Sequence, residues 1–295
     1  MEVIAKDWVH ATSTATTTFV RCAKCGHVYQ SPRRQIQFGH LMYPSDNALL
    51  ASDTPNFLIR VKMWIQYQRI AKLVEAVPSG GRIVEVGAGD GMLLLAIRQR
   101  SSNIQLTAID IAFSTQTKSR LESMHIEVIE SAVENSDFLE NTTLSMVDLV
   151  IMNQSIEHLW DPPSTFAGLF EVLKPSGLIV ITTPDYDGYD RKMWKKYWGG
   201  WYAPRHLNLF TRTEVIAMAS ALKMITVRVR SLVAPVIWCH SLGGFLIDRF
   251  PRSIIAQQLL KSSLPALAVF TGLDFVAKIL RFRTSNVEYI FRKSS

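Results

Sequence analysis

The sequence has few cysteines and few charged residues for its length. Only 3 of its 295 residues are cysteine, too few for the disulfide framework of a small secreted protein. The first residues do not combine a basic start with an apolar run, so we expect no secretory signal and a cytoplasmic location. Charged residues make up 19% and hydrophobic residues 48% of the chain, which excludes a disordered polymer and indicates a folded, somewhat apolar protein.

Acidic residues are scarce in the last third of the chain. From Arg191 onwards there are 17 Lys and Arg but only 4 Asp and Glu, whereas residues 1–190 carry 15 basic and 21 acidic residues. Such a basic segment is typical of proteins that bind anionic substrates, anionic lipid surfaces or nucleic acid, although a plain solvated surface has the same composition. The composition alone therefore leaves the partner of this segment open.

A glycine-rich stretch at residues 83–95 reads as a buried strand, a tight turn and the start of a helix. Gly87, Gly89 and Gly91 alternate along the turn, where backbone amides and a helix N-terminus can approach a ligand closely. A dinucleotide-binding pattern is excluded because Met92 stands where that pattern requires its last glycine. A phosphate-binding loop is excluded because no Gly-Lys-Ser/Thr closes the turn.

With the acidic Glu85 before it, this turn resembles the first motif of the class I S-adenosylmethionine (SAM) methyltransferases. A second strand ends about twenty residues later in Asp110, where the family, like many NAD-binding proteins, holds the ribose hydroxyls. Three later segments resemble small-molecule methyltransferases of the ubiquinone-biosynthesis type and those of sugars and natural products. These are residues 147–162, which contain Glu157-His158-Leu159-Trp160-Asp161-Pro162, residues 173–184, and residues 204–210, which begin Pro204-Arg205-His206-Leu207.

The resemblance implies an α/β fold with a Rossmann-like, seven-stranded, mostly parallel sheet and helices on both faces. The best candidate for the last strand is 286–292, far from the sixth at 225–229, so a helical insertion would precede the last strand. The predicted division is an N-terminal zinc-ribbon-like remnant and flap at 1–56, a SAM-binding core at 57–230, an insertion at 231–285, and the last strand with a tail at 286–295. Within the core, residues 185–204 form an aromatic insertion that either walls the acceptor pocket or covers the sheet edge.

The resemblance implies SAM as the cofactor, bound at the carboxyl ends of the strands. Glu85 and the glycine turn would surround its methionine and ribose, Asp110 would accept the ribose hydroxyls, and Asn153 would lie near the methyl end. The acid that contacts adenine in the family is replaced here by Ser131 or Glu134. The implied cofactor residues are Glu85, Gly87, Ala88, Gly89, Gly91, Asp110, Ile111, Ser131 and Asn153.

Two histidines are candidate catalytic bases. Transfer from a sulfonium needs mainly the positioning of donor and acceptor, but a hydroxyl acceptor must also lose a proton, and histidine suits that step at neutral pH. His158 follows the fourth strand, and His206 follows the aromatic insertion. Either histidine could instead have a structural role, and N- or C-methylation stays open because no motif identifies a base.

The N-terminal region resembles part of the zinc ribbon that begins many methyltransferases of sugars and natural products. Cys22 and Cys25 form one Cys-x-x-Cys pair, but the usual first pair is absent. Only His10 and His27 stand nearby as further ligands, so the alternatives are a zinc site at Cys22 and Cys25 or a relic held by packing. The Thr-rich first 20 residues predict little order.

The insertion at 231–285 contains two apolar runs flanked by basic residues. Each run, at 231–247 and 264–280, is near 17 residues long and is interrupted by polar groups, which is at or below the length of a membrane span. The runs could lie in a membrane interface, giving peripheral membrane contact, or form a helical cap or dimer surface. The oligomeric state stays open.

Three functions compete. The first is a SAM-dependent methyltransferase that acts on a small-molecule acceptor, a hydroxyl of a sugar, quinone-like or lipid-linked substrate. The second is a nucleic-acid methyltransferase, against which stands the absence of an Asn-Pro-Pro-Tyr-type motif after the fourth strand. The third is a non-catalytic SAM-fold protein that docks on a membrane or a partner. The family resemblance favours the first.

Overall fold

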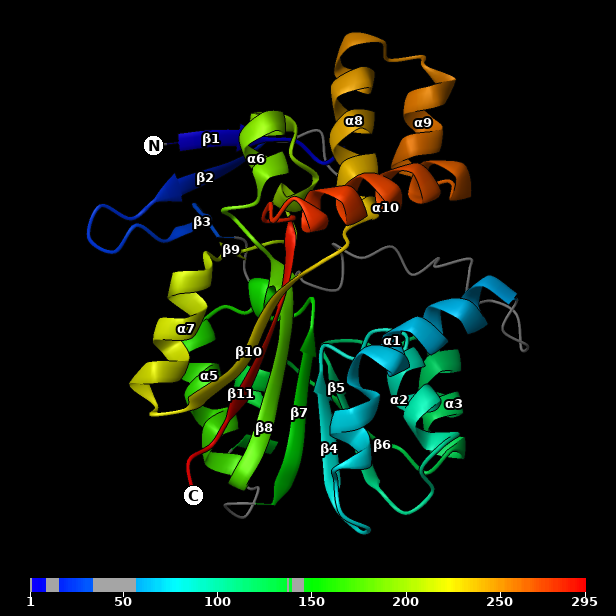
Figure 1. The fold of residues 1–295 in the computed structure, drawn as a ribbon, viewed down its shortest axis with the longest axis vertical. Coiled ribbons are helices and arrows are strands. Elements are labelled where there is room, and N and C mark those ends of the chain that lie inside the picture. The colour runs from blue at the N-terminus through cyan, green and yellow to red at the C-terminus, as the bar shows by residue number, and fades with distance from the viewer. Residues whose placement is uncertain (1, 9–15, 34–56, 137, 140–145) are drawn as a thin grey trace.

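A computed structural model describes residues 2–8, 16–33, 57–136, 138–139 and 146–295. Its centre is a seven-stranded sheet in the order β10-β11-β8-β7-β4-β5-β6, which confirms the predicted Rossmann-like fold (Figure 1). The inner strands are parallel, and β11 is antiparallel to both β8 and β10. The strands are β4 Arg82–Val86, β5 Gln105–Asp110, β6 Glu127–Glu130, β7 Val147–Asn153, β8 Leu173–Pro184, β10 Ile225–Leu232 and β11 Asn286–Arg292.

Helices cover both faces of the sheet because alternate residues of each strand point to opposite faces. Ile83 and Ile151 pack against one group of helices, whereas their neighbours Val84 and Val150 pack on the other side. The first face is covered by α1 Phe57–Glu75, α2 Met92–Arg98 and α3 Thr115–Ser123, and the second by α5 Pro162–Val172 and α7 Arg212–Ala221. The carboxyl ends of the parallel strands lie side by side between these two helical layers, and this end of the sheet is its carboxyl edge.

A second, four-stranded sheet lies beside that edge. It has the order β1-β2-β3-β9, and its strands are β1 Glu2–Ala5, β2 Thr17–Arg21, β3 Val28–Gln30 and β9 Asn208–Leu209. The expectation of little order in the first 20 residues was wrong for β1 and β2. Their threonines and valines favour extended backbone, and pairing with β3 and β9 supplies the partners that a local reading of the sequence does not show.

The aromatic segment after β8 packs under this second sheet. It forms α6 Tyr189–Trp194 and two short 3₁₀ turns, and the rings of Trp198 and Trp201 are almost completely buried. Trp201 lies against Phe19 of β2, with ring centroids 4.9 Å apart. Of the two predicted roles of this segment, these contacts favour a cover over the sheet edge.

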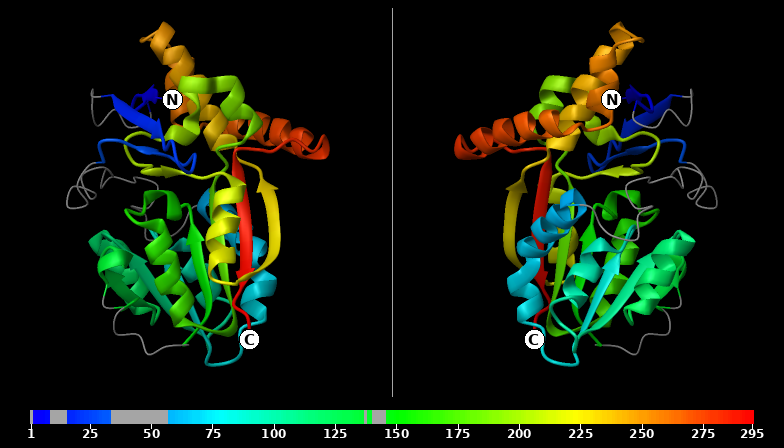
Figure 2. Two further views of the ribbon diagram at one scale, coloured as in Figure 1. Left: turned by 90° about the vertical axis from the view of Figure 1, so that its left-hand side faces the viewer. Right: turned by 90° about the vertical axis from the view of Figure 1, so that its right-hand side faces the viewer.

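Three helices form a cap between β10 and β11, at the carboxyl end of the sheet (Figures 1 and 2). They are α8 Pro235–Arg249, α9 Ile254–Leu260 and α10 Leu264–Ile279, and β10 itself continues to Leu232, inside the range predicted for the insertion. Among the described helices, none is by itself long and apolar enough to cross a membrane; α9 and α10 meet that test only as a pair bent by 68°.

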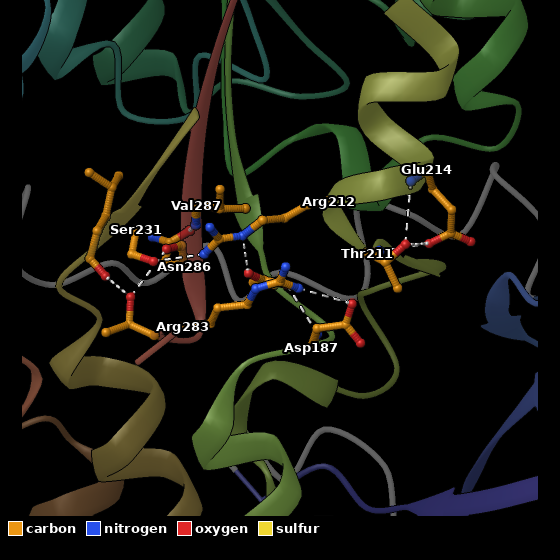
Figure 3. Close-up of polar contacts among 11 residues, drawn as sticks. Asp187, Thr211, Arg212, Glu214, Ser231, Arg283, Asn286 and Val287 are labelled. Atoms are coloured by element: carbon orange, nitrogen blue, oxygen red, sulfur yellow. Dashed lines mark hydrogen bonds and ion pairs between the residues drawn. The ribbon is translucent and has the colours of Figure 1, made fainter. Parts of the chain in front are cut away.

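Buried carboxylates hold α8 and α10 of the cap together and connect α7 to the segments below the cap. Asp274 of α10 accepts hydrogen bonds from the Trp238 indole at 2.9 Å and from the Ala234 amide at 2.6 Å. Below the cap, Arg212 of α7 donates to Asp185 and to Ser231. Figure 3 shows the contact between Arg212 and Ser231. Because buried charges are stable only when paired, the bonds of Asp274 fix how α10 packs on α8 within the cap.

Candidate active site

The glycine turn is tied to the end of the neighbouring strand. The amides of Gly87 and Ala88 both donate to the Ile109 carbonyl, at 2.8 and 3.1 Å, and the Gly89 amide donates to the Asp110 carboxylate at 2.7 Å. All three glycines have positive φ, at +73°, +53° and +67° for positions 87, 89 and 91. The turn thus holds a backbone shape that favours glycine, next to the acid at the end of β5.

The glycines differ in what surrounds them. A Cβ atom at Gly87 would lie 2.5 Å from the Ser155 Cβ, and one at Gly91 would lie 2.6 Å from Leu121. A Cβ atom at Gly89 would meet nothing within 4 Å. Gly87 and Gly91 are therefore required by close packing, whereas Gly89 lies on the open side of the turn, where a ligand can approach the backbone.

Several buried polar atoms at the same edge have no hydrogen-bond partner among the described residues. They are the Glu85 Oε2, the Ser155 Oγ and the Thr182 Oγ1 atoms. Burial, helped by repulsion from Asp90, raises the pKa of Glu85 well above its usual value. Leaving such groups unpaired costs about 1–3 kcal/mol each, so this edge is suited to a ligand with polar groups.

An arginine that the sequence analysis did not identify reaches this edge. Arg69 of α1 donates from Nη2 to the Asn153 Oδ1 atom at 3.0 Å, and its Nε lies 3.3 Å from the buried Glu288 carboxylate of β11. Arg228 and Arg230 of β10 pair with the same carboxylate. Glu288, a lone acid inside the apolar strand β11, was the available signal; Arg69 is one of several basic residues of α1 and had none.

The residues expected near the ribose and adenine lie together at the ends of β5 and β6. Burial raises the pKa of Asp110, although backbone amides, chiefly that of Gly89, oppose the shift. Ile111 follows it and is 41% exposed. The Ser131 amide donates to the Asp110 carbonyl at 2.9 Å, whereas Glu134 accepts a hydrogen bond from the Trp160 amide and so is occupied there.

The two candidate bases, which come from distant parts of the chain, are in contact. The rings of His158 and His206 cross edge to face with centroids 4.8 Å apart. His158 Nδ1 lies 3.0 Å from the Arg205 carbonyl, and His206 Nδ1 lies 2.8 Å from the Gly200 carbonyl. Because a carbonyl can only accept, each Nδ1 carries the hydrogen, and the lone pair of each neutral ring is on Nε2.

A buried glutamate completes this group. Thr183 donates to the Glu157 Oε2 atom at 2.8 Å, and Glu157 Oε1 lies 3.8 Å from the His206 Nε2 atom. Burial raises the pKa of Glu157 to about 8 and lowers the pKa of His158 to about 4 and that of His206 well below its usual value. At neutral pH the group therefore consists of two neutral imidazoles and a protonated carboxyl.

The cysteine pair lies in a tight turn between β2 and β3. The Gly26 amide donates to the Cys22 carbonyl at 3.0 Å, and amides of Cys25 and Lys24 hold the pKa of the Cys22 thiol below its usual value. His27 is already used, because its two ring nitrogens lie 3.0 Å from Glu214 and 3.2 Å from Asn208. His10 lies outside the described residues, so zinc at Cys22 and Cys25 stays a prediction.

A comparison with known protein families shows which family this chain belongs to. The model of a methyltransferase-domain family matches residues 62–222, which is more than half of the chain. This chain belongs to the class I SAM-dependent methyltransferases. The methyltransferase match begins in α1 and ends just after α7, so it contains the glycine turn, Asp110 and both candidate bases.

Curated relatives resemble only part of this methyltransferase. A ubiquinone biosynthesis O-methyltransferase of Xanthomonas axonopodis pv. citri is 29% identical over 107 residues, which are 36% of this chain and 44% of the relative. A probable SAM-dependent methyltransferase of Mycolicibacterium smegmatis is 26% identical over 124 residues, 41% of this chain and 43% of the relative. The chain thus spans less than half the length of these relatives.

Solved methyltransferase structures share the fold. A putative sarcosine dimethylglycine methyltransferase from Galdieria sulphuraria matches with a TM-score of 0.51 and 18% identity, over 80% of this chain and 86% of that one. A phosphoethanolamine N-methyltransferase from Haemonchus contortus, solved with SAM, matches with a TM-score of 0.52 and 17% identity, over 79% of this chain and 53% of that one.

We expect Gly87→Ala to disrupt the site far more than Gly80→Ala. Both positions have positive φ, so an alanine destabilises the backbone by about 1 kcal/mol at either one. They differ in their surroundings, because a Cβ at Gly80 meets nothing within 4 Å whereas a Cβ at Gly87 overlaps Ser155. Calorimetric titration with S-adenosylhomocysteine should show at least about tenfold weaker binding for Gly87→Ala only, because the shifted turn carries the ligand-facing amides. Equal affinities of the two variants would contradict the close-packing argument.

We expect the stability of Glu157→Gln to fall less steeply with rising pH than the stability of the wild type. The folded-state pKa of about 8 lies above the ordinary value of 4.5, so between these values the unfolded chain releases a proton that the folded chain keeps. Wild-type stability then falls across that window, by at most about 1.4 kcal/mol per pH unit from this group. Melting temperatures of wild type and variant, compared across the window, measure the difference.

The control for this measurement is Glu171→Gln, because Glu171 is exposed and its removal takes no carboxyl out of the interior. Glu157→Gln should gain stability relative to wild type as the pH rises, whereas the control should follow the wild type. A constant offset between Glu157→Gln and wild type at every pH would show that this carboxyl titrates alike in the folded and unfolded states.

Proposed function

We propose that this chain transfers the methyl group of SAM to a hydroxyl of a small-molecule acceptor, a sugar, a quinone-like molecule or a lipid-linked molecule. The observation that carries the proposal is the glycine turn bonded to Asp110 at the same sheet edge as a neutral histidine pair. The similarity to a ubiquinone biosynthesis O-methyltransferase of Xanthomonas supports oxygen as the methylated atom. The partial coverage of those relatives leaves the acceptor a proposal.

The cofactor residues fit SAM at this edge. Asp110 and the amide-lined turn receive the ribose, Ile111 with its exposed side chain lies along the adenine, and Ser131 lies beyond it. Asn153 and Glu85 face the methionine end, where the Arg69 guanidinium provides a cation for a carboxylate. SAM supplies a methyl group on a sulfonium, an activated leaving group, so the protein needs to orient and desolvate rather than to activate the donor.

His158 is the better candidate of the two bases. Its Nδ1 hydrogen is held by the Arg205 carbonyl, so Nε2 can accept the proton that the acceptor hydroxyl loses as the methyl–oxygen bond forms. His206 directs Nε2 toward the protonated Glu157 and is only 5% exposed, which suits a residue that packs against His158 and fixes its ring. The depressed pKa of His158 keeps it neutral through the physiological range.

Binding of the cofactor is tested with Asp110→Asn. The substitution keeps the shape but removes the charge that two ribose hydroxyls would donate to, so titration calorimetry should show SAM and S-adenosylhomocysteine affinities lowered by about tenfold or more. Glu122→Gln removes an exposed carboxylate from α3 and should leave both affinities unchanged. Wild-type protein that gives no heat and no thermal shift with either ligand would refute the methyltransferase proposal.

The base is tested with His158→Gln beside His206→Gln, using labelled SAM and a panel of hydroxyl acceptors. Loss of a general base should lower kcat by about 10²-fold or more for His158→Gln with SAM affinity retained, whereas His206→Gln should cost less. Because the pKa of His158 is lowered to about 4, wild-type activity should stay level from neutral pH down to well below the usual titration of histidine. A larger loss of kcat in His206→Gln than in His158→Gln would contradict His158 as the base and identify His206 instead.

A further inference from the structure

We propose that the outer face of α9 and α10 docks on the surface of a membrane that contains anionic lipid. This inference goes beyond methyl transfer and does not depend on it. Both helices lie on the outside of the cap, at the end of the molecule where the parallel strands finish (Figures 1 and 2). The apolar side chains, the fixed orientation of α10 and the surrounding charge each support the proposal.

The first observation is a helix that is apolar on nearly all sides but covered on one. Along α10 only Phe270, Asp274 and Ala277 are buried, and these residues share one narrow stripe. The side chains of Phe275 and Ile279 are 61% and 65% exposed, and Ile254 of α9 is 73% exposed. Exposed large apolar residues scattered singly are ordinary, but so many on two successive helices mark a contact surface: Ile254 and Ile255 on α9, and Leu264, Val269, Leu273, Phe275, Val276 and Ile279 on α10.

The orientation of this face is fixed from inside the cap. Asp274 is completely buried and accepts hydrogen bonds from the Trp238 indole and from the Ala234 amide, while Phe270 stacks on the Trp238 ring with centroids 5.7 Å apart. Rotating α10 to hide its apolar face would expose Phe270 and break both hydrogen bonds of a buried carboxylate, which costs several kcal/mol. The exposed face is therefore a property of the packed cap.

The second observation is the charge around the face. Residues 249–283 contain six basic side chains and a single acidic one, Asp274, which is buried. Lys278 and Arg281 are exposed within and just after the last turns of α10. Apolar side chains with cations beside them and no exposed carboxylate among them match the interface of an anionic bilayer, where each basic residue near the surface contributes about 1 kcal/mol.

The same charge pattern argues against a second copy of this chain as the occupant. In a two-fold symmetric dimer the same surface would face itself, so Lys278 and Arg281 of one copy would meet the same cations of the other; within the described chain, only Arg283 of the basic residues around this face has a carboxylate beside it, that of Asp187 at 3.5 Å. A bilayer with phosphate headgroups has the opposite sign and accepts the apolar side chains below the headgroups. The observations therefore favour lipid.

The test is flotation of the full chain with vesicles of phosphatidylcholine, alone and mixed with phosphatidylglycerol. Wild type should bind the mixed vesicles at low ionic strength and lose binding as salt is added or phosphatidylglycerol is left out. The double variant Phe275→Ser with Ile279→Ser should lower the partition coefficient by about tenfold or more, because two exposed apolar side chains no longer enter the interface. Lys278→Glu with Arg281→Glu should lower it similarly.

Matched controls carry the same kinds of substitution elsewhere. Val227→Ser removes a 52% exposed apolar side chain from β10, and Lys72→Glu reverses an exposed charge on α1, so both should bind vesicles as wild type does. Failure of wild type to bind mixed vesicles, or equal binding by all variants, would overturn the proposal. So would a concentration-dependent dimer that Phe275→Ser with Ile279→Ser dissociates, seen by light scattering together with absent vesicle binding.

Discussion

The pairing of β10 with β11 is the constraint on which the rest of the molecule depends. Leu232, the last residue of β10, lies directly opposite Asn286, the first residue of β11, and the whole cap is connected between these two neighbours. The Thr284 hydroxyl donates to the Leu232 carbonyl and closes the junction. Through the same strands, Glu288 reaches Arg69 of α1, so the arrangement that seats the cap also places a cation beside Asn153.

Ionisable groups near the glycine turn and those at the histidine pair of the candidate site differ in their partners. Near the glycine turn, Glu288 is surrounded by three arginines and Asp110 accepts from the Gly89 amide, whereas Glu85 keeps an oxygen without a partner among the described residues. At the histidine pair, burial shifts His158, His206 and Glu157 to their neutral forms. Neutral forms are the less costly ones where no opposite charge is available in a buried position.

The sequence predicts those parts of the structure that are encoded locally. The glycine turn and the buried strand that ends in Asp110 follow from patterns within a few residues, and both are present; the last strand at 286–292, expected from the family resemblance, is present as well. Arg69 and Glu288 are 219 positions apart, so their ion pair has no local signature. The N-terminal sheet was missed for the same reason, because its short strands gain stability only from β9 and from Trp201.

The position of β11 also determines the order in which the fold can be completed. Within the described chain β10 pairs only with β11, and β11 is the strand that joins it to β8. During synthesis β10 therefore emerges well before it has a place in the sheet, and β8 keeps an unpaired edge until residue 292 has been made. Contacts of such long sequence separation form slowly. An apolar cap that emerges in this interval has time to meet another surface before the core is closed.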